Sequence, residues 1–231
     1  FKIDEVYGMH NWPGVELGKF AIRSGPFFAA SDFIEATISG KGGHAAKPHE
    51  TIDPTVIASQ IVVALQTIAS RRADPVEQVV VSITSFETSS TAFNVIPQEV
   101  KIKGTVRTLD PDVRDLAEKE FMRITELTAE AMGGSADAKF TRGYPVMSNS
   151  SEQTEFAAKV ARDVAGECAE APLVMGGEDF AYMLEERPGA YILLGNGDSS
   201  PVHHPKYNFN DDAIPFGCSW LVELVEQKMP V

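Results

Sequence analysis

The stretch Asp32-Phe33-Ile34-Glu35-Ala36-Thr37-Ile38 decides the first part of the fold, because apolar and polar residues alternate along it. Alternation with a period of two is typical of a strand with one buried and one solvated face. A Gly- and His-rich loop follows, and Asp53-Pro54 then predicts a helix with proline in its first turn. Apolar residues recur at helical spacing from Ile57 to Leu65, and the helix is expected to end near Ser70.

Further predicted strands and a second helix follow along the chain. Val79 to Phe86 and Val100 to Leu109 are β-rich runs, Asp110-Pro111 predicts a second helix, and Ala136 to Thr141 predicts a short strand. Residues 31–142 therefore have the order β-α-β-β-α-β, which is that of a split βαβ, ferredoxin-like unit. With two helices on one face of its sheet, such a unit can bury a core of its own.

The flanking segments have a different pattern. Residues 1–30 indicate a short strand and loops, and residues 143–231 indicate helices around a fully apolar run from Ala190 to Leu194. Such a run is typical of a parallel strand buried on both faces. The predicted class is therefore α/β. We expect residues 1–30 and 143–231 to be the first and last parts of a partial α/β domain, into which residues 31–142 are inserted.

Composition excludes several classes of function. The 231 residues carry 20 Lys and Arg against 33 Asp and Glu, a formal net charge of −13. Such a chain repels phosphate backbones and anionic lipid, so no nucleic-acid or membrane partner is expected. No apolar run reaches the roughly 18 residues of a membrane span. Cys168 and Cys218 are the two cysteines of the sequence, which is no disulfide framework, and a cytoplasmic location is expected.

The five histidines all lie in predicted loops that contain glycine or proline, and loops are where binding groups concentrate. His10 ends one predicted strand and His203 follows another, and open α/β sheets bind ligands at the carboxyl ends of their strands. Two imidazoles there could bind Zn²⁺ or Mn²⁺, although a catalytic zinc has about three protein ligands. The alternative interpretation of each is a solvated loop side chain.

Other polar residues lie in turns and at strand ends. His44 follows two glycines and could donate to a carbonyl or oxyanion, or be a plain turn residue. Arg107 ends a strand, close in sequence to the turn that holds Asn94, and could grip a carboxylate with two donors or simply be solvated. Gly176 and Gly177 precede a predicted short helix, where backbone N–H groups can bind an anion.

Six motifs, in this order, carry a family resemblance. They are Gly8-Met9-His10-Asn11-Trp12-Pro13, Gly40-Lys41-Gly42-Gly43-His44-Ala45-Ala46-Lys47-Pro48-His49, Phe93-Asn94-Val95-Ile96-Pro97, Gly104-Thr105-Val106-Arg107, Gly177-Glu178-Asp179-Phe180 and His203-His204-Pro205-Lys206-Tyr207-Asn208-Phe209-Asn210-Asp211. Through them the whole chain resembles the C-terminal part of the metal-dependent amidohydrolases. That family includes hippurate hydrolase, the auxin-conjugate hydrolases and N-acetyldiaminopimelate deacetylase, within the aminoacylase and carboxypeptidase G2 superfamily.

The resemblance implies a two-domain hydrolase of N-acyl amino acids, such as hippurate-like or N-acetyl substrates. It implies an α/β catalytic domain with two divalent metal ions (Mn, Zn, Ni or Co), and a lid, residues 31–142, that forms a homodimer. His10 and His203 match metal ligands. His44 matches a lid histidine that reaches into the partner subunit's site and stabilises the tetrahedral oxyanion. His204 stands where relatives show Asn, Ser or Thr, and is not expected to be a ligand.

Substrate binding is implied in the same way. Asn94 and Arg107 match lid positions that hold the amide and the carboxylate of the substrate. Gly176 and Gly177 match a backbone loop that meets the same carboxylate.

The chain departs from the family in one respect. The family carries, before the Gly-Met-His motif, a Cys-Gly-His-Asp-Gly-His run and a Glu-Glu pair that supply the other ligands and the general base, and this sequence contains neither. Hydrolysis needs a complete metal site and a base within reach. We therefore expect amide hydrolysis of the parent protein but none by this chain alone. One alternative is a non-catalytic dimerisation or binding module, and another is a thiol hydrolase using Cys168 or Cys218 on helical segments.

Overall fold

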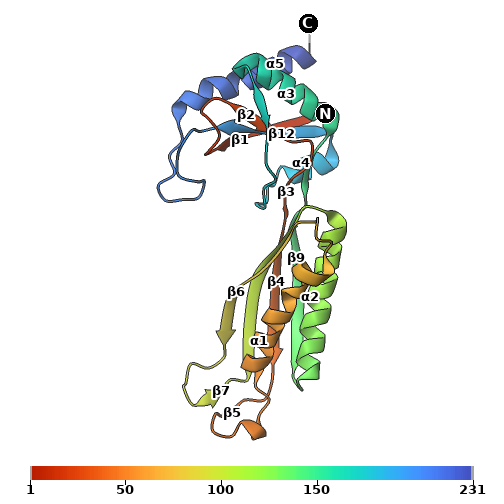
Figure 1. Cartoon of the computed structure of the whole chain (residues 1–231), viewed down its shortest axis with the longest axis vertical. Helices are drawn as coiled ribbons and strands as arrows, with labels where there is room; N and C mark the ends of the chain where they lie inside the picture. The colour runs from red at the N-terminus through yellow and green to blue at the C-terminus, as the bar shows by residue number, and fades with distance from the viewer. Residues whose placement is uncertain (1, 230–231) are drawn as a thin grey trace. The chain divides into compact units, whose positions relative to one another are not determined.

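A computed structural model describes residues 2–229 of the chain, and its contacts divide into two compact units (Figure 1). Unit 1 takes in the chain up to Phe28, Met147–Val174, and the chain from Glu178 on. Unit 2 comprises Ala29–Val146 and the short segment Met175–Gly177. Each unit has its own hydrophobic core.

Unit 2 is a four-stranded antiparallel sheet covered on one face by two helices (Figure 1). Its sheet has the order β6-β8-β4-β9, which is the strand order of a ferredoxin-like unit. Its elements are β4 (Ala30–Ser39), α1 (Pro54–Leu65), β6 (Val79–Thr88), β8 (Glu99–Thr108), α2 (Pro111–Ala131) and β9 (Ser135–Tyr144). The role of residues 31–142 as a lid or a dimerisation unit stays a prediction.

The two helices of unit 2 begin as their sequence indicates. Asp53 accepts a hydrogen bond from the Thr55 N–H at 2.8 Å, and Asp110 accepts from the N–H groups of the second and third residues after it. The first helix ends earlier than expected, at Leu65 rather than near Ser70. The chain then widens into a π turn, η2 (Ile68–Arg72), which keeps the Ile68 side chain in the core.

One end of unit 2 carries a small ladder that the sequence indicated only as loops. β5 (Gly43–His44) pairs antiparallel with β7 (Val95–Ile96), and η1 (Pro48–Glu50) follows β5. This pairing fixes the two glycine-rich and proline-containing loops to one another.

Unit 1 contains a mixed sheet of order β1-β12-β2-β11. β1 (Val6–Trp12) runs parallel to β12 (Gly189–Gly195), whose seven residues are all buried. β2 (Phe20–Ile22) is antiparallel to β12 and parallel to β11 (Cys168–Glu170). The apolar run from Ala190 to Leu194 is thus a central strand with one parallel and one antiparallel neighbour.

The rest of unit 1 consists of short elements and three helices. They are β3 (Gly25–Phe28), β10 (Met147–Asn149), α3 (Ser151–Ala165), α4 (Ala181–Glu186), η3 (Asp211–Ala213) and α5 (Ile214–Lys228). The sequence pattern did not indicate β2, β3, β10 or β11, because strands of three or four residues show no measurable alternation. The expectation that Cys168 lies on a helix is wrong, since it begins strand β11.

These observations confirm the α/β class. Within the described residues, no helix combines the length and the apolar character that crossing a bilayer requires.

Candidate functional site

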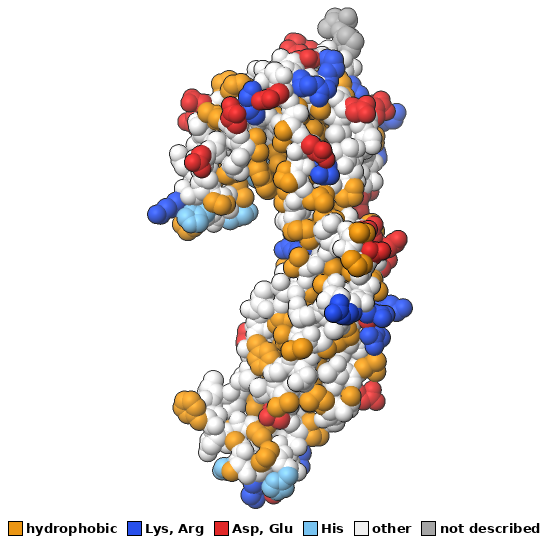
Figure 2. All heavy atoms as spheres, viewed as in Figure 1, with side chains coloured by type: hydrophobic (Ala, Val, Ile, Leu, Met, Phe, Trp, Pro, Cys, Tyr) orange, Lys and Arg blue, Asp and Glu red, His pale blue; other side chains and the backbone are white. Residues whose placement is uncertain are grey.

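The sequence-predicted site residues fall into three groups. His10 and His203 lie in unit 1; Arg107, Gly176 and Gly177 lie together in unit 2; His44 and Asn94 lie together elsewhere in unit 2. Figure 2 shows histidine side chains at the surface of both units, on the loop between β12 and α5 and at the β5–β7 end of unit 2.

His10 is held in a definite tautomer. Its Nδ1 lies 2.6 Å from the backbone oxygen of Asn11, and a carbonyl can only accept, so Nδ1 carries the proton. Nε2 therefore presents a lone pair. This is the usual state of a metal-binding histidine, whose other nitrogen donates to a carbonyl or carboxylate. The half-buried ring packs edge-on against Trp12 and Tyr191, with centroids 5.4 and 6.4 Å away.

The hydroxyl of Tyr191 stays protonated beside this ring. Burial, reinforced by the Glu178 carboxylate, raises the pKa of Tyr191 above its ordinary value. The phenol of Tyr191 is therefore uncharged where it packs against the His10 ring.

His203 lies in the loop that joins β12 to η3, and its side chain is exposed. Its φ of 66° is the one positive value among the non-glycine residues of the described chain. A residue other than glycine seldom adopts this conformation, and such positions cluster at functional sites. The loop is fixed to β1 through Tyr207, whose hydroxyl donates to Asn11 Oδ1 at 2.7 Å.

His204, the next residue, presents the opposite group. Its Nδ1 accepts a hydrogen bond from the Lys206 N–H at 3.1 Å, so the proton lies on Nε2. A protonated nitrogen cannot bind a metal ion. In this conformation His204 is a donor, in contrast to His10.

Within residues 2–229, no group of three or more His, Cys, Asp or Glu side chains is placed to hold one metal ion. His10 and His203 are thus candidate ligands that need further groups to complete a site.

Arg107 and Gly177 are neighbours in space, although 70 positions of sequence separate them. A Cβ built on Gly177 would lie 3.2 Å from Arg107 Nη1 and 2.7 Å from the Cβ of Ser31. The backbone at Gly177 therefore runs directly beside the guanidinium. Gly176 is tied to the same unit, because its oxygen accepts from the Ala29 N–H at 3.0 Å. A guanidinium beside exposed main chain is an arrangement that can bind a carboxylate.

Gly176 and Gly177 precede a short helix, as the sequence indicated, but Glu178, Asp179 and Phe180 separate them from its first residue. α4 begins at Ala181, its N-cap is Phe180, and no side chain caps it. Because this helix has only six residues, its N-terminus is no anion site. An anion beside Gly177 would be bound by Arg107 and the main chain.

His44 is also fixed in one tautomer. The Ala46 N–H donates to His44 Nδ1 at 3.1 Å, so Nε2 carries the proton and is a donor on an exposed residue. A donor of this kind can stabilise an oxyanion. Asn94 lies alongside, because its backbone oxygen accepts from the Ala45 N–H at 3.0 Å.

Gln98 is a residue of this region that sequence reasoning missed. Its side-chain oxygen accepts from the Gly42 N–H at 3.0 Å, and its amide nitrogen donates to the Gly40 oxygen at 2.6 Å. Gln98 thus closes the glycine loop before His44. No local pattern reveals this role, because the partners are 56 and 58 positions away.

The loop that precedes His44 is tied to the start of β8, whereas Arg107 lies near the end of this strand. The glycine loop contacts Gln98, just before the strand starts at Glu99, whereas Arg107 is next to its last residue. Eight residue steps along a strand span about 26 Å. One chain therefore does not bring the His44 donor and the Arg107 guanidinium to the same small molecule.

Residues 1–227 match the model of peptidase family M20/M25/M40. The chain belongs to this family. It is 37% identical over 98% of its length to N-acetyl-L-cysteine deacetylase of Bacillus subtilis, of which it covers 54%. It is 35% identical over 97% of its length to N-acetyldiaminopimelate deacetylase of Streptococcus thermophilus, of which it covers 60%. The chain thus spans a little over half the length of these curated relatives.

Among solved structures, a dinuclear metal-binding peptidase of the M20 family from Bacillus subtilis superposes with a TM-score of 0.82 at 28% identity. The match covers 98% of this chain and 58% of that one. The family that the sequence motifs indicated is therefore confirmed. The roles of the individual site residues stay predictions.

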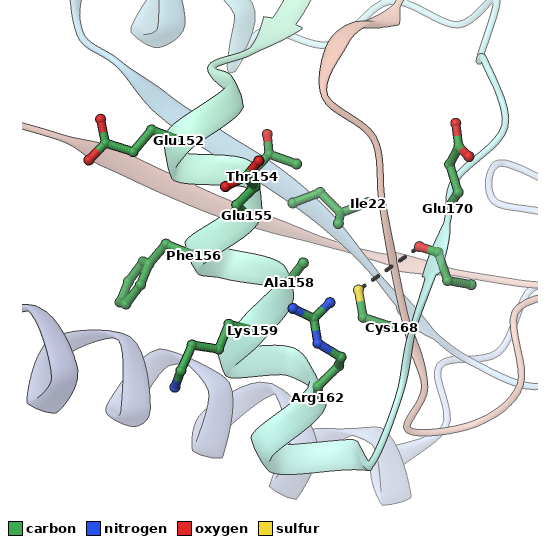
Figure 3. Close-up of a pocket in the computed structure, with 11 residues that line it drawn as sticks. Ile22, Glu152, Thr154, Glu155, Phe156, Ala158, Lys159, Arg162, Cys168 and Glu170 are labelled. Atoms are coloured by element: carbon green, nitrogen blue, oxygen red, sulfur yellow. Dashed lines mark hydrogen bonds between the residues drawn. The ribbon is translucent and has the colours of Figure 1, made fainter.

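The thiol alternative finds no support in the groove that contains Cys168. This groove, of about 710 Å³, lies between α3 and β11 and is drawn in Figure 3. Burial raises the pKa of the Cys168 thiol to about 11, although the nearby charge of Arg162 acts in the opposite direction. No histidine lines the groove to take the proton. A thiol that stays protonated at neutral pH is a poor nucleophile.

Proposed function

We propose that this chain contributes to a metal-dependent hydrolase that cleaves the amide bond of N-acyl amino acids. One observation carries the proposal: the Nδ1 hydrogen bond of His10 leaves its Nε2 lone pair available, next to a strand end to which the loop of His203 is fixed. Membership of the M20 family supports the same reading, since relatives of this chain are named as deacetylases of N-acetyl amino acids.

His10 and His203 would hold part of a site for two divalent ions, Mn, Zn, Ni or Co. The chemistry of the donors fits this assignment: His10 presents a neutral imidazole nitrogen, Nε2, and imidazole is a common ligand of these divalent ions. When bound, the ions would supply Lewis-acid chemistry toward the amide carbonyl and a water molecule.

The amino-acid half of the substrate is assigned to unit 2. Arg107 supplies two parallel donors for a carboxylate, and the backbone of Gly176 and Gly177 beside it narrows the place where that carboxylate can sit. Asn94 would hold the substrate amide.

His44 would stabilise the oxyanion in the site of a partner subunit. Its Nε2–H is the right donor for a developing negative charge, and its distance from Arg107 along β8 requires the two groups to come from different chains. A homodimer formed through unit 2 would meet this requirement.

A non-catalytic dimerisation or binding module is the second candidate. The observation that favours it is that no group of three or more metal-binding side chains converges within the described residues. On this reading the chain alone is inactive, although the parent protein is a hydrolase.

Two measurements separate the candidates. The first is the metal content of the purified chain after exposure to Mn²⁺ and Zn²⁺, by elemental mass spectrometry, with H10A and the exposed-histidine control H49A. About two ions per chain, reduced in H10A alone, would show that the chain completes a metal site by itself and would favour the enzyme. About zero would favour the module.

The second measurement tests the parent activity. The chain is fused to the part of the Bacillus subtilis N-acetyl-L-cysteine deacetylase that it does not match, and the fusion is assayed with hippurate and N-acetyl amino acids. Turnover that disappears in H10A and in R107Q is expected. A folded fusion that binds Mn²⁺ but cleaves none of these amides would refute the proposed function.

A further inference from the structure

We propose that Tyr207 is a positioning residue, which holds the loop carrying His203 against the strand carrying His10 by donating to Asn11. The inference rests on the proposed function, because it takes the two histidines as ligands of the same metal site. It goes beyond that function in assigning to Tyr207 and Asn11 the task of setting the distance between the ligands.

The ends of the loop are fixed by a buried asparagine, Asn196, of which 3% is exposed. Its amide nitrogen donates to Ser199 Oγ at 2.8 Å and to the Asn208 oxygen at 3.0 Å. Its oxygen accepts from the Asn210 N–H at 2.8 Å. One side chain thus binds the outgoing and the returning limb of the loop.

The same loop base is attached to the end of β1. The Asn196 N–H donates to the Trp12 oxygen at 3.1 Å, and the Gly14 N–H donates to the Gly197 oxygen at 3.0 Å. The carboxyl end of β1 and the base of the loop are therefore one rigid body. What remains to be fixed is the middle of the loop, which contains His203.

The two limbs lie near neighbouring residues at the end of β1. Side chains alternate along a strand, so His10 and Trp12 lie on one face and Asn11 on the other. The outgoing limb, through Pro201 and Val202, lines a cavity of about 290 Å³ together with Trp12. The returning limb places Tyr207 on Asn11.

Along the loop, His203 lies between Val202, which lines the cavity, and Tyr207, which donates to Asn11. Its φ of 66° is that of a tight turn, which a histidine adopts at a cost in conformational energy. A strained turn persists when its surroundings hold it on both sides. The Tyr207 hydroxyl supplies the hold on the returning side, four residues after His203.

The hydrogen bond to Asn11 therefore acts on both candidate ligands. Asn11 accepts from Tyr207 with its side chain and from His10 with its backbone oxygen. If Tyr207 moves away from Asn11, the loop moves relative to β1, and the distance between His203 and His10 changes with it.

The test is zinc binding by the 231-residue chain, followed residue by residue in imidazole ¹H–¹⁵N spectra. In the unchanged chain, the His10 and His203 signals should respond to zinc at one shared midpoint, below that of the exposed His49. In Y207F that midpoint should rise about two- to tenfold, the effect expected for one hydrogen bond to a neutral partner. N11A should do the same, and the double variant should add little, because both changes remove one contact.

Y7F is the matched control. It removes a tyrosine hydroxyl of the same unit, which donates to Glu5 at 2.8 Å, at the opposite end of β1 from the loop. Its zinc midpoint should equal that of the unchanged chain. Circular dichroism and thermal melting verify that each variant is folded, and N11A carries the test if Y207F is not.

Two different results would overturn the inference, and they are distinguishable. A shared midpoint that Y207F and N11A leave unchanged would show that the ligands pair without Tyr207, while the metal assignment stands. His10 and His203 signals that respond separately, no earlier than His49, would remove the ligand pair itself and with it this part of the proposed function.

Discussion

At the scale of single residues, hydrogen-bond partners decide what each histidine offers. His10 presents a lone pair, whereas His44 and His204 present an N–H, because their Nδ1 atoms accept from backbone N–H groups. The sequence places all of them beside turn residues and does not separate these roles. The separation follows from local geometry, and it agrees with a ligand role for His10 and a donor role for His44.

Gly177 is predicted to tolerate no side chain. In G177A the new Cβ would lie 2.7 Å from the Ser31 Cβ and 3.2 Å from Arg107 Nη1, so the loop or the guanidinium must move. We expect a loss of about 1–3 kcal/mol in the free energy of unfolding, as for other overpacked sites. Urea denaturation measures it. In a chain that already carries S31G, G177A should cost less unfolding free energy than it costs in the unchanged chain, because the Cβ that it crowds is gone. An equal cost in both chains would contradict the crowding argument.

Cys168 is predicted to resist alkylation until strongly alkaline pH. Its pKa is raised to about 11, and a raised pKa keeps the thiol protonated, so that at pH 8 about one thiol in a thousand is ionised. Iodoacetamide labelling of Cys168 should rise steeply between about pH 9 and pH 11. Peptide mass spectrometry follows each cysteine separately, with the exposed Cys218 as the reference. Rapid labelling of Cys168 at neutral pH would contradict the raised pKa that burial gives this thiol.

The motifs identify which residues are candidates, but not what holds them in place. Gln98 and Tyr207 were missed because their partners are distant in sequence; Tyr207 and Asn11 are 196 positions apart. Asn196 was missed although its side-chain partners are only 3 to 14 positions away, because they lie in an irregular loop without a repeating pattern. Local sequence reasoning works where cause and effect lie within one turn or strand, as for the Asp53 and Asp110 helix caps.

At the scale of elements, a buried ion pair joins α2 to β4. Asp32 is fully buried, and Arg114 donates to it through Nε at 2.9 Å and through Nη2. The Gly143 N–H on β9 donates to the same carboxylate at 3.0 Å, and Arg114 also donates to the Gly143 oxygen at 3.2 Å. One ion pair thus connects a helix with the two adjoining strands β4 and β9.

R114M should destabilise unit 2 by about 3–5 kcal/mol, because it leaves the Asp32 charge buried and unpaired. The control is R142A, which removes an exposed pair with Asp115 and Glu118 and should cost no more than about 1 kcal/mol. Denaturant unfolding of the two variants under identical conditions measures the difference. Similar losses in both would show that Asp32 is not effectively desolvated.

The long elements of the fold follow from the sequence, whereas the short ones follow from their neighbours. The strand from Ala30 and both helices of unit 2 carry clear periodicity and caps. β2 and β11 have three residues each and exist because the edge of β12 offers hydrogen bonds to β2, and β2 in turn to β11. No propensity encoded in three residues announces such a pairing.

At the scale of the whole molecule, unit 1 exposes apolar side chains in a helical stripe on α5. These are Ile214, Leu221, Val222 and Val225, between 45% and 58% exposed, whereas the face of Gly217, Trp220 and Leu224 is buried. A large exposed apolar patch promotes association.

We predict that L221K combined with V225E increases the fraction of monodisperse chain in size-exclusion chromatography and changes the unfolding free energy by less than about 0.5 kcal/mol per site. The buried-face variant L224K should instead unfold the chain, and an unchanged elution profile for the double variant would exclude the stripe as the cause of association.

Whether His44 acts across a dimer is a question about two chains, and a mixing experiment in the fusion protein answers it. H44A and R107Q should each be inactive, because each removes one required group from both sites of its homodimer. When the two are co-expressed in equal amounts, half of the dimers are mixed, and each mixed dimer regains one intact site, so about a quarter of the normal activity should return. The control places both changes on one chain. In hybrids of H44A-R107Q with the unchanged protein each site lacks one group, so an equal mixture should show only about the quarter of normal activity that its unchanged homodimers supply, whereas a histidine that serves its own chain would leave about half. No recovery in the first mixture would mean that His44 serves its own chain, which the length of β8 in this conformation does not allow without a rearrangement of unit 2.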